Sequence, residues 1–139
     1  MIDAMGRGFE EVSHTADVAL RIWGRDLAEL FINAARGLAW LMADPDTVQP
    51  TVAVPLELTA YDAETLLVSW LGELLYRNER DGTLFTTFEI EEITPTHLRG
   101  VAKGGPAQEI RQPIKAVTFS DLAIRRAERG LEVTVVFDV

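Results

Sequence analysis

The sequence has no cysteine, and this absence removes several kinds of chemistry at once. A chain without cysteine forms no disulfide, holds no zinc through thiolates and has no thiol nucleophile. Histidine is almost as scarce, because only His14 and His97 are present and they are far apart in the sequence. A zinc or copper site built on histidines is therefore not expected. A chain of this kind is expected to be cytoplasmic.

Positive charge is also in short supply. Lys and Arg total 13 against 22 Asp and Glu, which gives a formal net charge of −9. Such a surface repels a polyanion, since nucleic-acid binding rests on basic groups that neutralise phosphates. We expect no stable direct binding to nucleic acid. The sequence also lacks a charged-then-apolar leader and any apolar run near the roughly 18 residues of a membrane helix, so no membrane association is expected.

What is present is an ordinary globular composition with two clear helical patterns. The chain has 139 residues, 47% of them hydrophobic, without a repeat or an evident domain boundary, so residues 1–139 are predicted to form a single domain. Apolar residues recur every three or four positions from Leu27 to about Met42 and from Ala63 to about Asn78. Asp26 and Asp62 stand where an N-cap belongs, and Gly82 fits a C-terminal turn.

The remaining segments indicate strands. Alternating or β-branched patterns favour extended structure at residues 9–12, 17–24, 51–61, 83–93, 97–104, 114–128 and 131–139. Pro55 fits an edge or a bulge, and the last two segments are predicted to form an antiparallel hairpin. The order favours an α+β fold, a two-layer sandwich with two amphipathic helices packed on a mainly antiparallel sheet.

Two aspartates stand out because they lie on strand segments that are otherwise built for burial. Asp17 stands at the start of the strand predicted over residues 17–24, and Asp138 interrupts the last strand beside Val139. Carboxylate oxygens suit hard cations such as calcium or magnesium, and the terminal group of Val139 adds another oxygen donor if the two strands meet. The alternative is that each aspartate caps a turn or faces water.

Three further residues are candidates with ordinary alternatives. Lys115 is one of only two lysines, and its stem could cover apolar surface while its ammonium reaches a carboxylate cluster. It also fits a plain surface lysine. His14 could be a ligand, but it equally fits a hydrogen-bonded histidine, and Glu73 fits the solvated face of its helix.

Four strings in a fixed order resemble the archease family over nearly the whole chain. They are "HTADVALRIWG" at residues 14–24, with "LAELFINAARGL" behind it, then "LLVSWLGELLY" at 66–76, "IKAVTF" at 114–119 and the terminal "VVFDV". The resemblance implies an α+β sandwich and a small cytosolic protein that is not itself an enzyme. It further implies a cofactor of the RtcB-type 3′-phosphate RNA ligase of tRNA splicing and RNA repair, which promotes guanylylation of the ligase and multiple turnover.

The same resemblance implies which residues act. The family's metal site corresponds to Asp17, Asp138 and Val139, with calcium expected ahead of magnesium as the divalent ion. The lysine thought to act with them corresponds to Lys115, and a helix glutamate corresponds to Glu73. The chain departs from the family pattern at Phe119–Ser120, where Tyr-His is common, and at Gly72, where a polar residue is usual. These departures leave the ligase-facing surface open.

Two other functions remain compatible with the sequence. A metal-dependent phosphohydrolase could use Asp17, Asp138 and His14 with a divalent ion. A chaperone-like binding module would use the metal only to stabilise the last strand. The sequence leaves the metal, the oligomeric state and the nature of the RNA targets open.

Overall fold

The computed structural model describes residues 6–13, 17–128 and 130–139. In chain order its elements are β1 (Phe9–Val12), β2 (Val18–Gly24), α1 (Leu27–Met42), a short 3-10 helix η1 (Pro45–Thr47), β3 (Val52–Thr59), α2 (Ala63–Asp81), β4 (Thr83–Thr94), β5 (His97–Pro106), β6 (Ala116–Val117), β7 (Arg125–Ala127) and β8 (Gly130–Asp138).

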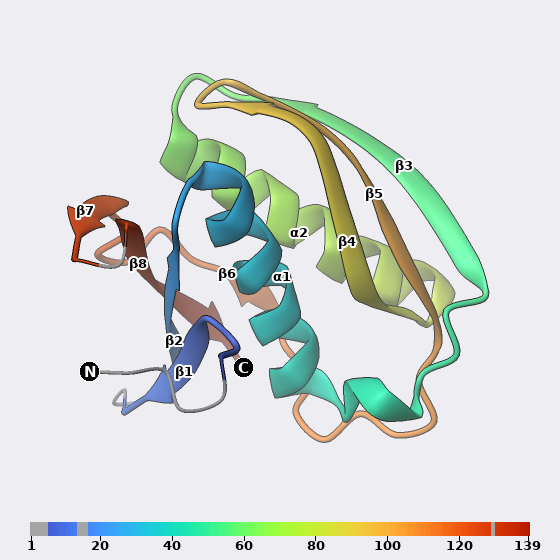
Figure 1. Ribbon diagram of the computed structural model, residues 1–139. Coiled ribbons are helices and arrows are strands. Elements are labelled where there is room, and N and C mark those ends of the chain that lie inside the picture. The colour runs from blue at the N-terminus through green and yellow to red at the C-terminus, as the bar shows by residue number, and fades with distance from the viewer. Residues whose placement is uncertain (1–5, 14–16, 129) are drawn as a thin grey trace.

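The strands form two antiparallel sheets, with the helices between them (Figure 1). One sheet has the order β1-β2-β8-β6, with β7 also paired to β8, and the other has the order β3-β5-β4. Helix α1 contacts β2 on one side and β4 on the other, while α2 contacts β4, β3 and β6. The α+β prediction of two helices packed on antiparallel strands is confirmed. The structure divides the predicted sheet into two.

Helix α1 has the bounds that its pattern predicted. Asp26 is the N-cap, and its carboxylate accepts a hydrogen bond of 2.9 Å from the backbone N–H of Glu29. The Glu29 carboxylate in turn accepts hydrogen bonds from the backbone N–H and the guanidinium of Arg25, at 3.0 and 2.9 Å. These bonds, the backbone one first, hold the pKa of Glu29 below its usual range. The start of α1 is thus held by its own side chains.

Helix α2 begins at its predicted cap but continues to Asp81, past the predicted end near Asn78. The backbone N–H of Thr65 donates to Asp62 at 2.8 Å, and Gly82 ends the helix with a φ of 75°. That left-handed conformation favours glycine. The indole N–H of the fully buried Trp70 donates to the carbonyl oxygen of Phe31 at 2.9 Å, which ties α2 to α1.

The β3-β5-β4 sheet contains two shifts in the pairing register between β4 and β5. They lie between Phe85 and Thr87 and between Ile90 and Glu92. At both places β5 carries a glycine, because a Cβ atom on Gly100 or Gly104 would collide with a backbone oxygen of β4. Close backbone approach therefore requires glycine here. β3 is an edge strand, which confirms the position predicted for Pro55.

The prediction of one continuous strand over residues 114–128 is wrong. Only Ala116–Val117 and Arg125–Ala127 are strands in this segment. Between them the N–H of Leu122 donates to the carbonyl of Phe119 at 3.1 Å, and Asp121 has a φ of 52°. Aspartate tolerates this left-handed conformation better than most residues, and a turn replaces the strand. The predicted hairpin between β7 and β8 is confirmed as antiparallel.

The core lies where the helices meet both sheets. Its largest fully buried side chains come from α1, α2, β2, β5 and β8, and they include Trp70, Phe31, Phe137, Leu20, Ile22, Leu30 and Leu98. Among the helices of the described residues, none is long and apolar enough to cross a membrane.

Candidate functional site

The two singled-out aspartates lie at the same end of the β2–β8 ladder. The antiparallel register pairs Val18 with Phe137, so Asp17, just before Val18, and Asp138, just after Phe137, come to that end together. Phe137 is fully buried in the core, whereas Asp138, on the opposite face of the strand, is exposed. Asp17 is half-buried. The structure thus brings together two carboxylates from opposite ends of the sequence.

Lys115, the residue before strand β6, lies at the same end of the β2–β8 ladder. Ala116 pairs with Asp138, and the backbone N–H of Lys115 donates to the carbonyl oxygen of Asp138 at 2.8 Å. The N–H of Thr118 donates to Val136 at 2.9 Å on the far side of the same short ladder. The side chain of Lys115 is exposed. The backbone of Lys115 is therefore bonded directly to that of Asp138, while its side chain lines a surface groove with helix α2.

The segment before Lys115 is fastened to the end of helix α1 by Arg111. The guanidinium of Arg111 donates to the carbonyl oxygens of Trp40 and Ala43, at 2.7 and 3.0 Å. Its backbone N–H donates to the carbonyl of Met42 at 2.7 Å. The last turn of α1 has no basic residue of its own, so Arg111 supplies both hydrogen bonds and a cation to free carbonyls there. Sequence reasoning did not identify this residue.

The donors at this edge fit a hard divalent cation in chemistry but not in number. Asp17 and Asp138 offer carboxylate oxygens, and the half-buried Val139 offers backbone oxygen. Calcium takes six to eight oxygen ligands, and magnesium six. Among the residues that the structure describes, no group of three or more His, Cys, Asp or Glu side chains is arranged to hold a metal ion. A cation here would need further oxygens from water or from another molecule.

The other two sequence candidates are His14 and Glu73. His14 lies outside the described residues. Glu73, on α2, accepts a hydrogen bond of 2.7 Å from Arg77 one turn later, and both side chains are half-buried. Glu79, not Glu73, is the α2 carboxylate that lines the surface groove shared with Lys115. The phosphohydrolase alternative needs the undescribed His14, so the described residues offer it two carboxylates only.

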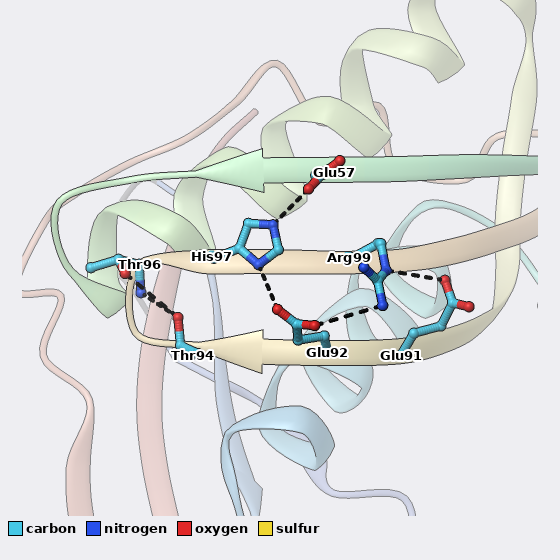
Figure 2. A network of polar contacts seen from close by, with 7 residues as sticks. All are labelled: Glu57, Glu91, Glu92, Thr94, Thr96, His97 and Arg99. Atoms are coloured by element: carbon cyan, nitrogen blue, oxygen red, sulfur yellow. Dashed lines mark hydrogen bonds and ion pairs between the residues drawn. The ribbon is translucent and has the colours of Figure 1, made fainter.

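A second polar cluster covers the outer face of the other sheet (Figure 2). His97 on β5 lies between Glu57 on β3 and Glu92 on β4, with Nε2 at 2.7 Å and Nδ1 at 3.2 Å from their oxygens. Arg99 reaches Glu92 at 3.6 Å and Glu91 at 3.9 Å. These cross-strand pairs join three strands at an exposed surface, where ion pairs contribute little each. His97 thus links β3, β5 and β4, in the sheet that does not contain β2 and β8.

Comparisons with known proteins cover nearly the entire chain. Residues 9–139 match a family model described as Archease protein family (MTH1598/TM1083). The chain is 38% identical over 127 residues to the protein archease of Methanopyrus kandleri, covering 86% of this chain and 91% of that protein. It is 35% identical to the protein archease of Methanosarcina acetivorans, covering 98% and 99%.

Two solved structures share the fold. The solution structure of Methanobacterium thermoautotrophicum protein 1598 superimposes with a TM-score of 0.82 at 33% identity, covering 96% of this chain and 99% of that one. A crystal structure from Thermotoga maritima, titled an archease and possible chaperone, has a TM-score of 0.65 at 21% identity and covers 94% and 96%. At that lower identity the second likeness concerns the fold alone.

Proposed function

Because the chain belongs to the archease family, we propose that it is a non-catalytic activator of an RtcB-type 3′-phosphate RNA ligase in tRNA splicing and RNA repair. It would promote guanylylation of the ligase and multiple turnover. The observation that carries the proposal is that the backbones of Asp17, Lys115 and Asp138 come together at one end of the β2–β8 ladder. Such a mixed cluster at a surface suits contact with another protein's reactive site better than chemistry of its own.

Each residue of the cluster has a distinct part in this proposal. The carboxylates of Asp17 and Asp138 and the backbone oxygen of Val139 would hold a divalent ion, calcium ahead of magnesium. Such an ion, when bound, supplies positive charge near the phosphates of the ligase's nucleotide. The Lys115 ammonium would add a positive charge close to this ion, because the backbone N–H of Lys115 donates to the carbonyl oxygen of Asp138. The ligase itself would supply the oxygens that this chain lacks.

The charge of the chain supports an activator over an RNA carrier. The formal net charge of −9 opposes direct binding of a polyanion. An activator that held RNA by itself would also compete with the ligase for its substrate. The acidic surface is better suited to a basic protein surface, such as that expected around an RNA-ligase active site.

The test is a ligation assay with 3′-phosphate RNA in large excess over the cognate ligase, with GTP and divalent ion supplied. Ligase alone should stop near one equivalent of product, and ligase with this protein should continue through many turnovers. Equal product in the two reactions would contradict the activator role. Guanylylated ligase, followed with labelled GTP, should accumulate faster in the presence of the protein.

A chaperone-like role is the second candidate, favoured by exposed aromatic side chains. Tyr61 is 83% and Phe119 58% exposed, which is high for rings that usually pack against protein. The Thermotoga maritima relative bears the words possible chaperone in its title. This candidate is expected to suppress aggregation of an unrelated unfolding protein, and Tyr61→Ser with Phe119→Ser should remove that effect. Unchanged aggregation with the wild-type protein would exclude it.

A further inference from the structure

A groove of about 290 Å³ runs between helix α2 and strand β6. Its lining includes Val68, Gly72, Tyr76 and Glu79 from the helix, and Lys115 and Val117 from the facing segment. Lys115 thus belongs both to this groove and to the sheet edge that carries Asp138. A molecule seated in the groove would contact Lys115, one of the three proposed activating residues.

The floor of the groove holds a glycine that the packing of this chain does not explain. Apart from its chain neighbours and the backbone of its own helix, no heavy atom of the described residues lies within 4 Å of the position that a Cβ atom would take on Gly72. The glycine in α1 is different, because a Cβ atom on Gly37 would press against Leu20 and Phe9. Glycine is the least favourable residue in a helix interior apart from proline. An unexplained glycine beneath a groove indicates that something outside this chain approaches the helix backbone there.

The side chains that line the groove indicate which kind of molecule would bind there. Tyr76 is 54% exposed and offers an aromatic face, and Val68 and Val117 offer apolar surface. Glu79 offers a carboxylate to a cation, in a chain whose net charge already favours a basic partner. RNA does not suit this surface, because Lys115 is the one cation among the groove residues and Glu79 would repel phosphate. A protein segment with an apolar side chain beside a basic one does suit it.

We propose that the α2–β6 groove is the surface on which the RNA ligase docks. One apolar side chain of the ligase sits over Gly72 against Tyr76, and a neighbouring basic residue pairs with Glu79. This inference rests on the proposed function, since the occupant is the ligase. In this proposal the groove provides affinity for the ligase, and Asp17, Lys115 and Asp138 activate the bound ligase.

The decisive variant is Gly72→Leu, which places a side chain in the groove at a position where a Cβ atom meets open space. Because the space above Gly72 is open, the variant should unfold at the wild-type temperature or above it. The protein concentration that gives half-maximal stimulation of ligation should rise at least tenfold, with the same maximum at saturation. Binding to the immobilised ligase should weaken by the same factor. Glu79→Arg should weaken binding in the same direction.

Ser69→Leu is the matched control, because it adds the same side chain to α2 at a half-buried position outside the groove lining. It should leave the half-maximal concentration unchanged. If wild type stimulates and Gly72→Leu has the same half-maximal concentration, the groove is not the docking surface. If wild type neither binds nor stimulates the ligase, the proposed function fails and this inference fails with it.

Two other readouts separate competing occupants of the groove. Sedimentation of wild type and Gly72→Leu should give equal masses, since a loss of mass on substitution would assign the groove to a second copy of this chain. A fluorescent 3′-phosphate RNA should show no binding that Gly72→Leu abolishes. Either contrary result would overturn ligase docking at this site.

Discussion

The guanidinium of Arg111 donates a 2.7 Å hydrogen bond to the carbonyl oxygen of Trp40, which lies 71 positions earlier in the chain. A second bond of 3.0 Å reaches the carbonyl of Ala43. Through this contact a loop residue completes the end of helix α1, and the loop that continues to Lys115 acquires a fixed starting point. The stability of the end of α1 and the position of Lys115 thus both depend on the side chain of Arg111.

Replacing Arg111 by Gln should therefore affect both properties. The loss of two charge-assisted hydrogen bonds is expected to lower the free energy of unfolding by about 1–3 kcal/mol. Maximal stimulation of the ligase should also fall, because Lys115 is held less firmly beside Asp138. Urea denaturation and the ligation assay measure the two effects. Arg111→Lys should restore part of both, and Arg126→Gln, an exposed substitution on β7, should change neither.

Substitution of Asp17, Lys115 or Asp138 should remove stimulation of the ligase without unfolding the protein. Asp17→Asn, Lys115→Met and Asp138→Asn are each expected to abolish stimulation at any concentration of the protein, while the melting temperature stays within a few degrees of wild type. The side chains of Lys115 and Asp138 are exposed, so their removal leaves no cavity. Asp46→Asn, an exposed aspartate of η1, is the control. Full stimulation by Asp17→Asn and Asp138→Asn would contradict the proposed roles.

Divalent ions should stabilise the protein through the same aspartates. Binding to the folded state alone raises the free energy of unfolding by about 2.7 kcal/mol at 100 times the dissociation constant. Thermal unfolding with increasing calcium or magnesium should therefore show a rising midpoint that EDTA reverses. Asp138→Asn should remove the response. A midpoint in wild type that is independent of both ions would argue against ion binding by these aspartates in the absence of the ligase.

Two glycines should respond to alanine in opposite directions. Gly72→Ala is expected to raise the free energy of unfolding by up to about 1 kcal/mol, because alanine is a better helix former and its methyl group meets open space. Gly100→Ala should lower it by about 1–3 kcal/mol, because the methyl group would collide with the backbone oxygen of Glu89. Denaturant titrations of both variants test the contrast directly.

Acid should remove the contribution that the Arg25–Glu29 contact at the start of α1 makes to the free energy of unfolding. Hydrogen bonds from Arg25 lower the pKa of Glu29 in the folded state from its ordinary value of 4.5. The stabilisation is therefore present above that ordinary value and is lost as the pH falls through the lower, folded-state pKa. Because Glu29 is partly exposed and its partner Arg25 is exposed, we expect a contribution to stability of less than about 1 kcal/mol. The stability difference between wild type and Glu29→Gln should be constant near neutral pH and should vanish in strong acid.

Much of the local structure was predictable because it depends on residues close together in the sequence. Asp26 and Asp62 begin the helices, Gly82 ends the second, and the three- and four-residue spacing of apolar side chains gives the buried face of each. The failure at residues 114–128 has the same origin. Its β-branched and apolar residues favour extended structure, but Asp121 adopts a left-handed turn that the pattern does not register.

The sequence by itself determined the helices, most strands, the acidic charge and the residues worth testing. Only the tertiary structure decided that Val18 pairs with Phe137, that Lys115 lies beside Asp138, and that Arg111 completes helix α1. The reason is physical: capping and periodicity act over one or two helical turns, whereas these three contacts join residues 119, 23 and 71 positions apart. Burial of one common core selects that pairing.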